Sequence, residues 1–371
     1  MKGARLEAMA RLAVEYSTRV KPGDLCVLDG PSSCSEILLA IARAVVRAGG
    51  NPVMRVELDG WKETFLREAS DAALDWVAPG DLLAYEQADV LIVLDADWNT
   101  RALATADPAR QARRSRARRP LQDIFMERGA AGELRWLVLG VPALANAQDA
   151  GMSLDDYEEL LARVGHLDDP DPVAYWLAYE KELQRVADFM AGVRQLRFVA
   201  EGTDLTLGVA GRSWFASSGR ENFPDGEVFT GPEETTAEGV IQFSFPAVYR
   251  NREVDGVRLR FERGAVVEAT AERGEEFLRA MIEQDEGARF LGEVAFGLND
   301  ALTDSARSTL LDEKIGGTVH LALGASYPET GGINVSALHW DMVCDLRSGG
   351  EVWADGALVY RDGRFLPGVL G

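Results

Sequence analysis

The chain of 371 residues is poor in cysteine and histidine, with three of each, and it has no run of 18 apolar residues. The missing apolar run argues against a membrane-spanning helix. Cys26, Cys34 and Cys344 form no CxxC pair and no zinc-finger spacing, so we expect reduced, buried thiols in a cytoplasmic protein. Basic residues are also outnumbered: the formal net charge of −21 opposes a broad nucleic-acid-binding surface.

One segment departs from this acidic balance. Residues 110–120 read RQARRSRARRP and contain six arginines. Such a run either binds nucleic acid or an acidic partner, or forms the solvated face of a helix. We favour the solvated face, and we expect neither nucleic acid nor a membrane among the partners.

The length predicts two domains. Residues 1–190 alternate short apolar runs with helical patterns, which predicts an α/β domain with an open, mostly parallel sheet and flanking helices. The strand-like runs are residues 25–30, 51–58, 88–97 and 135–142. Residues 191–371 contain short strand patterns, glycine turns and one clear helical pattern at 274–288, which predicts an α+β domain.

Two of the three histidines lie in the segment 318–341, TVHLALGASYPETGGINVSALHWD. Because side chains alternate along a strand, His339 and Asp341 should share one face, with Trp340 on the other. A turn at YPETGG would bring this strand close to the one that carries His320. Two imidazoles and a carboxylate that converge are a metal-ligand set, although separately packed histidines would give the same local pattern. Local spacing leaves both interpretations open.

Two glutamates occur in nearly identical surroundings. Glu227 lies in GEVFTGP and Glu293 in GEVAFG, each within a short apolar run flanked by glycine. A solvent-exposed position is the default for an acidic residue. Inside an apolar run, however, a buried carboxylate is costly unless it has a partner.

These segments together carry a family resemblance. GEVFTGP, GEVAFG, LLDEKIGGTVHLALGASYP, GGINVSALHWDMVCDL and GEVWADGALVYRDGRF resemble, in this order, the aminopeptidase T / aminopeptidase S (PepS-like) family of thermophilic metalloproteases. The resemblance covers most of the C-terminal half and extends more loosely over the α/β half. It makes the second domain the catalytic, metal-binding one.

The resemblance implies a set of six metal ligands: Glu227, Glu293, His320, Tyr327, His339 and Asp341. It further implies two divalent ions, zinc with cobalt or manganese as substitutes, and a bridging hydroxide that attacks the N-terminal peptide bond of a short peptide. Six ligands exceed what one tetrahedral zinc with an open position needs. Glu293 and Tyr327 are expected to act in catalysis as well, and the family form is a homodimer with an enclosed cavity. The stretch between Tyr327 and His339 is shorter than in better-known members, which leaves substrate preference open.

Several roles and two other functions stay open. Tyr327 either binds a metal, donates a hydrogen bond to the oxyanion, or packs in a turn. Glu313 is a candidate general base, but Lys314 beside it could simply be its salt-bridge partner. A ring-cleaving dihydroxypyridine dioxygenase would need only His320, His339 and Asp341 around iron. A non-enzymatic peptide-binding protein with structural metal is the second alternative.

Overall fold

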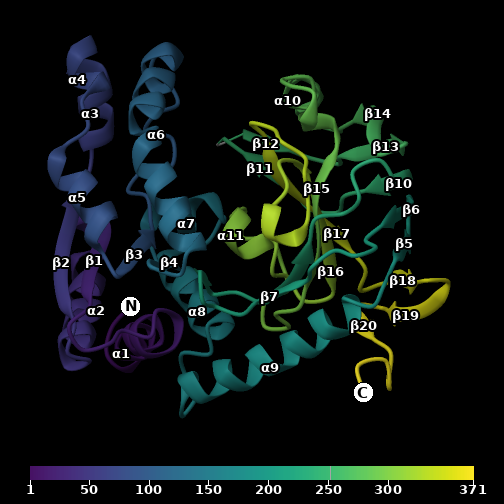
Figure 1. The fold of residues 1–371 in the computed structure, drawn as a ribbon, viewed down its shortest axis with the longest axis horizontal. Helices are drawn as coiled ribbons and strands as arrows, with labels where there is room; N and C mark the ends of the chain where they lie inside the picture. The colour runs from purple at the N-terminus through teal and green to yellow at the C-terminus, as the bar shows by residue number, and fades with distance from the viewer. Residues whose placement is uncertain (251) are drawn as a thin grey trace. The chain divides into compact units, whose positions relative to one another are not determined.

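A computed structural model describes residues 1–250 and 252–371 (Figure 1). The chain forms two compact units: unit 1 is Met1–Leu177 with Gly219–Pro224, and unit 2 is Ala178–Ser218 with Asp225–Gly371. The first boundary between the units falls inside helix α9 (Pro172–Met190). The domain boundary that the sequence suggested, after residue 190, stays a prediction. Among the residues that the structure describes, none of the helices combines the length and apolar character needed to cross a bilayer.

Unit 1 contains the predicted parallel sheet, with strand order β2-β1-β3-β4-β8. The strands are β1 (Leu25–Pro31), β2 (Asn51–Glu57), β3 (Val90–Asp95), β4 (Arg135–Gly140) and β8 (Asn222–Phe223). The inner strands are apolar and buried because helices accompany a parallel sheet on both faces. The helices are α1 (Ala4–Arg11), α2 (Ser35–Arg47), α3 (Trp61–Glu68), α4 (Asp71–Asp75), α5 (Pro79–Gln87), α6 (Pro108–Ala130), α7 (Leu144–Asp149) and α8 (Leu154–Val164). The predicted α/β class of this half is confirmed.

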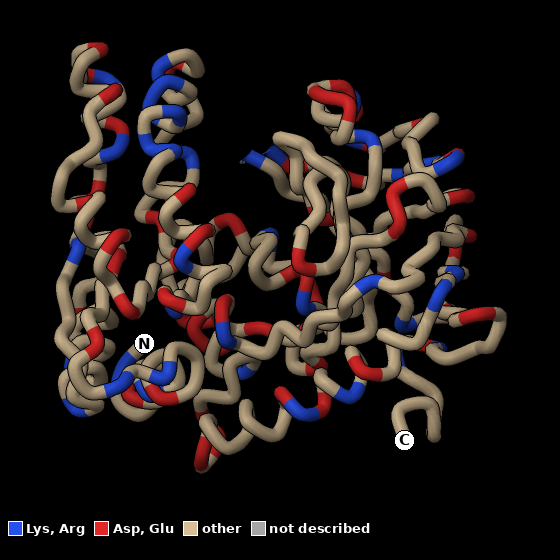
Figure 2. The backbone as a smooth tube through the Cα atoms, in the orientation of Figure 1, with Lys and Arg blue, Asp and Glu red and all other residues tan. Residues whose placement is uncertain are grey.

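The arginine-rich segment lies on α6, which carries most of the basic colour in the upper part of this unit in Figure 2. Arg113 forms ion pairs with Asp71 and Asp75 of α4, and Arg110 donates to backbone carbonyl groups of residues 66 and 69. Arg119, in contrast, is exposed. The predicted solvated face is therefore correct only in part: several of these arginines fasten neighbouring helices to α6.

At the carboxyl end of β3, Asp95 carries a stability cost that depends on pH. Burial, and to a lesser extent the charge of Asp97, raises its pKa from 3.8 to about 6. The native state therefore binds this proton more tightly than the unfolded chain, and stability falls as the pH rises from about 4 to about 6. We expect Asp95→Asn to raise the free energy of unfolding by about 1–2 kcal/mol at pH 7.5, a value reduced for the partial exposure of the group. The gain should be smaller at pH 4.5, because the native carboxyl group is then already mostly protonated.

Urea unfolding at both pH values measures this difference. Glu86→Gln removes an exposed carboxylate on α5 and is the matched control, expected to have a small effect at either pH. An Asp95→Asn variant that gains the same stability at pH 4.5 and pH 7.5 would contradict the assignment.

Unit 2 is mostly antiparallel and rich in strands. Counting the parallel sheet of unit 1 as the first, unit 2 contains a second and a third large sheet. The second sheet has the strand order β14-β13-β10-β6-β5-β18-β19-β20, and the third sheet has the strand order β17-β16-β15-β9-β7. The second sheet consists of β5 (Gln195–Ala200), β6 (Thr203–Gly208), β10 (Glu238–Gln242), β13 (Arg258–Glu262), β14 (Ala265–Thr270), β18 (Glu351–Ala354), β19 (Ala357–Arg361) and β20 (Arg364–Phe365). The third consists of β7 (Phe215–Ser217), β9 (Glu227–Thr230), β15 (Leu291–Gly297), β16 (Thr318–Gly324) and β17 (His339–Asp345).

Shorter elements complete unit 2. A hairpin pairs β11 (Ala247–Tyr249) with β12 (Arg252–Val254). The helical pattern predicted at 274–288 forms α10 (Glu275–Ile282), and α11 (Thr309–Asp312) precedes β16.

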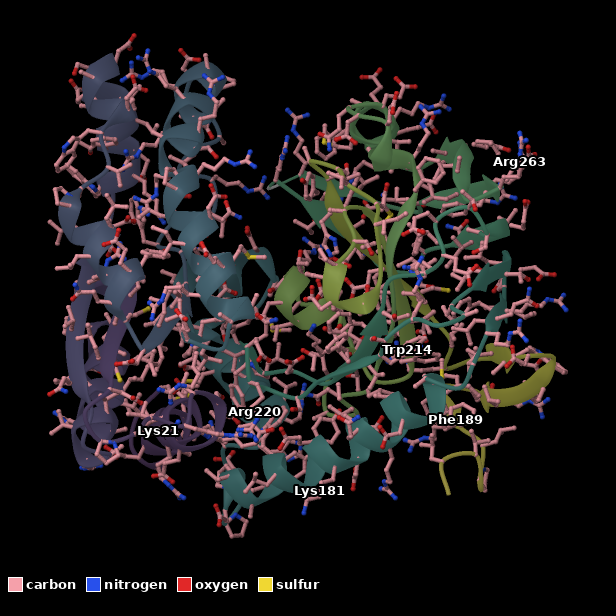
Figure 3. All side chains as sticks on the ribbon, in the orientation of Figure 1. Lys21, Lys181, Phe189, Trp214, Arg220 and Arg263 are labelled. Carbon is pink, nitrogen blue, oxygen red and sulfur yellow. The ribbon has the colours of Figure 1, made fainter. Side chains whose placement is uncertain are left out.

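The core of unit 2 lies between the second and third sheets. Phe296 of β15 is fully buried, and its ring centroid lies 6.4 Å from that of Phe198 on β5. Trp214, labelled in Figure 3, is also buried, with its ring 6.3 Å from Phe296. Trp340 and Cys344 of β17 belong to the same core. Since strand residues alternate, the other face of the third sheet is left for polar side chains.

Candidate metal centre

Strand alternation places two of the predicted ligands on the same face of β17. His339 and Asp341 point to one side of the third sheet, while Trp340 between them is buried in the core, as the sequence predicted. The neighbouring strand β16 carries His320, and antiparallel pairing sets Ala322 opposite Asp341. The turn between the two strands has therefore brought both histidines onto adjacent strands.

Small residues leave room around the two imidazoles. Ala295 of β15 lies opposite His320, and Gly324 of β16 lies opposite His339. Gly324 has a φ of +104°, and a Cβ atom there would come within 2.1 Å of the carbonyl oxygen of Leu338. The positive φ and this close approach to the backbone of Leu338 mean that the position requires glycine.

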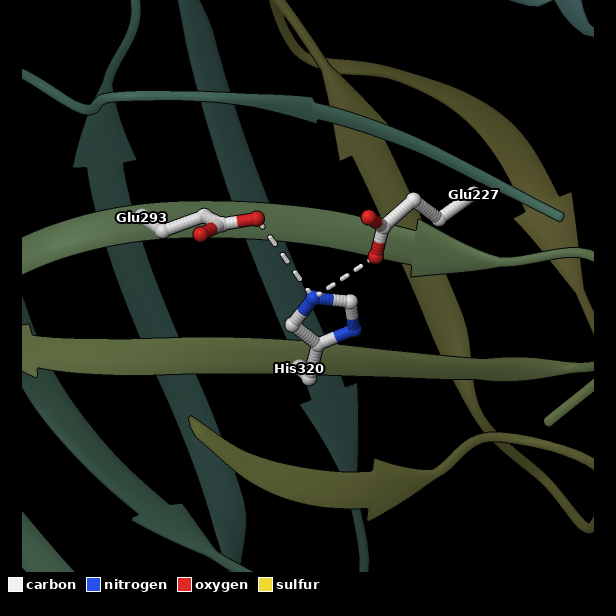
Figure 4. Close-up of side chains that lie close together, drawn as sticks. All are labelled: Glu227, Glu293 and His320. Carbon is white, nitrogen blue, oxygen red and sulfur yellow. Dashed lines mark ion pairs between the residues drawn. The ribbon is translucent and has the colours of Figure 1, made fainter. Parts of the chain in front are cut away.

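The first of two ligand groups consists of Glu227, Glu293 and His320 (Figure 4). His320 Nε2 lies 3.2 Å from Glu227 Oε2 and 3.6 Å from Glu293 Oε1. Glu227 lies on β9, Glu293 on β15 and His320 on β16, and these strands are neighbours in the third sheet. All three are buried, so this group is shielded from solvent.

The second group consists of Glu293, His339 and Asp341. His339 Nε2 lies 3.2 Å from Glu293 Oε2 and 3.6 Å from Asp341 Oδ2. The other ring nitrogen, Nδ1, lies 2.8 Å from the carbonyl oxygen of Ala325, which fixes the ring with Nε2 toward the carboxylates. The imidazole of His339 is 28% exposed, so this group is the more open one. Glu293 thus supplies one carboxylate oxygen to each group.

Unsatisfied polar atoms test whether these residues fit a metal. Within the described part of the chain, Glu227 Oε2, Asp341 Oδ1 and both ring nitrogens of His320 are buried without a hydrogen bond of ordinary geometry. Buried polar atoms normally have partners, because leaving them without one is costly. Converging carboxylate oxygens and imidazole nitrogens are typical ligands of zinc and similar ions. The donor sets of both groups therefore fit a divalent cation.

The charges in the site shift several pKa values. Burial opposes ionisation of Glu293, but contacts with His320 and His339 outweigh it and lower its pKa to about 2. Burial disfavours the charged ring of His339, yet Asp341 and Glu293 raise its pKa to about 10. Burial raises the pKa of the Asp341 carboxyl to about 8. Since metals bind neutral imidazole, an entering cation must displace protons, and metal affinity should increase with pH.

A buried lysine adjoins the first group. Lys314 Nζ lies 2.5 Å from Glu227 Oε1, 2.9 Å from Glu313 Oε2 and 3.6 Å from Asp225 Oδ1. The Glu313–Lys314 pair that the sequence suggested is present. The contacts of Lys314 with Glu227 and Asp225 were missed, because they join segments far apart in the chain. Burial disfavours the ammonium group, but the three carboxylates outweigh it and raise the pKa of Lys314 well above 10.5.

Tyr327 lies at the open side of the second group. Its ring centroid is 5.2 Å from that of His339 in an edge-to-face arrangement, and the side chain is 38% exposed. Burial of the hydroxyl group, together with the charges of Glu293 and Asp341, raises the pKa of the phenol above its usual value. The structure therefore brings all six predicted residues to one region of unit 2. Their roles as ligands stay a prediction.

The family of thermophilic metalloproteases (M29) matches residues 2–365, nearly the whole chain. The chain belongs to this family. The family prediction from the sequence motifs is thereby confirmed, and M29 membership implies that the protein binds a divalent metal.

Three aminopeptidases are relatives of this M29 protein. Aminopeptidase T of Thermus thermophilus is 29% identical over 352 residues, which are 87% of this chain and 85% of the relative. Aminopeptidase T of Thermus aquaticus is 30% identical over 360 residues, with the same coverage of both chains. Aminopeptidase 2 of Geobacillus stearothermophilus is 27% identical over 390 residues and covers 91% of each chain.

Two solved structures resemble this M29 protein. Wild-type AmpT from Thermus thermophilus matches with a TM-score of 0.85 and 26% identity, over 98% of this chain and 99% of that chain. A 2,5-dihydroxypyridine dioxygenase from Pseudomonas putida KT2440 matches with a TM-score of 0.63 and 15% identity, over 100% of both chains. The second likeness shows that the same fold occurs in the dioxygenase, and no more than the fold.

Proposed function

We propose that the protein is a metal-dependent aminopeptidase that removes N-terminal residues from short peptides. The observation that carries this proposal is the carboxylate of Glu293, whose two oxygens belong to two different ligand groups. M29 membership and the aminopeptidases among the relatives support peptide hydrolysis as the reaction.

The two ligand groups would hold two divalent ions, and Glu293 would contribute to both groups. Glu227 and His320 complete the first ligand group, and His339 and Asp341 complete the second. Zinc is the expected metal, with cobalt or manganese as substitutes. When bound, the two ions would supply Lewis acidity to the scissile carbonyl group and to the attacking water.

The remaining polar groups handle the substrate and its protons. The phenol of Tyr327 adjoins His339, and a protonated phenol can donate a hydrogen bond to the oxyanion that forms at the scissile carbonyl. Glu313 lines the same small cavity as Asp341 and is paired with Lys314. A carboxylate in this position can accept a proton from water and pass it to the departing amine. The peptide would enter from the side of His339, the more exposed imidazole.

Chelation tests the proposal directly. Dialysis against EDTA should lower the hydrolysis of a dipeptide such as Leu-Ala more than tenfold, since a Lewis acid contributes several kcal/mol to such a reaction. Zinc, cobalt or manganese should restore activity, with about two ions per chain by elemental analysis. Metal retained without any peptide hydrolysis would favour a structural metal in a peptide-binding protein instead.

The iron dioxygenase is the second candidate, because a dioxygenase shares the fold. It would need His320, His339 and Asp341 around a single iron. The structure instead distributes the two histidines over different groups, with Glu293 common to both. One iron per chain, together with oxygen-dependent ring cleavage of a dihydroxypyridine, would support the dioxygenase against the aminopeptidase.

The family resemblance also leads us to propose a cytoplasmic homodimer whose active site faces an enclosed cavity. Such a cavity would admit short peptides and exclude folded proteins. Light scattering on the purified protein measures the oligomeric state, and an active monomer would overturn the enclosed-cavity arrangement.

A further inference from the structure

A row of aromatic rings leads to the metal centre along the third sheet. Phe229 lies two residues after Glu227 on β9, so both side chains point to the same face. Phe215 on the neighbouring strand β7 pairs with Phe229, and their rings stack with centroids 5.7 Å apart. The Phe229 ring also meets Tyr327 at 5.5 Å, and Tyr327 meets His339 at 5.2 Å. The row thus joins the sheet edge to the second ligand group.

This row remains accessible although it is apolar. Phe215 is 36% exposed, Tyr327 is 38% exposed and Phe229 is half-buried. On the opposite face of the same sheet, Phe296 is completely buried in the core. Burial in the core thus explains Phe296 but not the phenylalanines on the face that carries the ligands. Exposed contiguous apolar surface beside a polar site is typical of a binding site.

We propose that Phe215, Phe229 and Tyr327 form the surface that receives the side chain of the peptide's N-terminal residue. This inference rests on the proposed aminopeptidase function. A substrate whose scissile carbonyl group lies at the metal centre has its N-terminal side chain within a few bonds of that point. The row begins beside His339 and extends away from it, so it offers such a side chain apolar contact. The enzyme should therefore prefer peptides that begin with leucine, phenylalanine or another large apolar residue.

Truncation of Phe229 tests this specificity role. For Phe229→Ala, kcat/KM for Phe-Ala and Leu-Ala should fall about 10- to 100-fold, as expected when apolar contacts in a specificity pocket are lost. The value for Gly-Ala, which has no side chain to place, should change less than about threefold by the same reasoning. The metal content should stay the same. Val267→Ala, which truncates an exposed apolar residue on β14 of the same unit, is the control and should leave all three values unchanged.

A second variant and a second readout keep the test decisive. Phe215→Ala removes an exposed ring at the sheet edge and serves as the test if Phe229→Ala fails to fold. It should show the same selective loss of kcat/KM for Phe-Ala and Leu-Ala, in weaker form. Calorimetry of the metal-loaded protein should give tighter binding of L-phenylalanine than of glycine, with the difference reduced in either variant.

The outcomes separate this inference from the proposed function. An equal loss for all dipeptides, or no loss, would overturn the subsite while hydrolysis itself stands. A change in oligomeric mass with unaltered selectivity would assign the aromatic row to an interface between two copies of the chain and would also overturn it. If the wild-type protein hydrolyses no dipeptide, the proposed function fails, and the calorimetric preference alone decides whether the row binds apolar side chains.

Discussion

Glu293→Ala should remove both metal ions and lower kcat/KM by about three orders of magnitude, since each ~1.4 kcal/mol of lost transition-state stabilisation is a factor of ten. Glu293 is the residue whose carboxylate oxygens lie 3.6 Å from His320 Nε2 and 3.2 Å from His339 Nε2. Its loss leaves two ligands in each group, too few for a stable site with an open position. Elemental analysis and a dipeptide assay on the same preparation measure the two effects together.

Two further variants sharpen this experiment. Glu293→Gln keeps the shape but offers one neutral oxygen, so it should still lose metal in at least one group. Glu276→Gln alters an exposed carboxylate on α10 and should keep full metal content and turnover. A Glu293→Ala protein that retains two ions and wild-type turnover would refute the ligand assignment.

Lys314→Met should have the largest effect on stability. The substitution keeps the length and volume of the side chain but leaves Glu227, Glu313 and Asp225 without their shared positive charge. Removing one partner of a buried ion pair destabilises a protein by about 3–5 kcal/mol. We therefore expect a loss of this size in EDTA at pH 8, measured by urea unfolding.

The pH and the metal should modify this loss in a defined direction. Protonation relieves unpaired carboxylates, so the deficit of Lys314→Met should be smaller at pH 5 than at pH 8. Divalent metal should also reduce it, because the cation next to Glu227 replaces part of the missing charge. Lys181→Met, at an exposed position on α9 labelled in Figure 3, is the control and should change stability by less than about 0.5 kcal/mol. Equal stability of Lys314→Met and wild type in EDTA would contradict this account.

Local patterns predicted a large part of the fold. The apolar runs at 25–30, 51–58, 88–97 and 135–142 form the parallel strands β1 to β4 of unit 1. Short apolar segments that alternate with helical patterns are typical of the strands of a parallel sheet. Period-two alternation assigned His339 and Asp341 to one face and Trp340 to the core. Both results depend on residues that are near each other in the chain.

Contacts between distant segments were beyond local patterns. Glu227 and Glu293 were found through the family motifs, since only the pairing of β9 with β15 brings them together. Lys314 was read as a partner of its sequence neighbour, and its shorter contact with Glu227 depends on that same sheet. Arg113 likewise looked solvated, because its partners on α4 lie about 40 residues earlier along the chain.

Strand β8 has a consequence for how such proteins can recombine. Residues 219–224 leave unit 2, add an edge strand beside β4, and return to unit 2 just before Glu227. A fragment that ends at Leu177 would lack this strand and expose the backbone hydrogen-bonding groups of β4, a surface prone to aggregation. Exchange of the α/β half between homologous genes therefore needs three crossover points, after residues 177, 218 and 224, and a chimaera made with a single junction would carry an edge strand from the wrong parent.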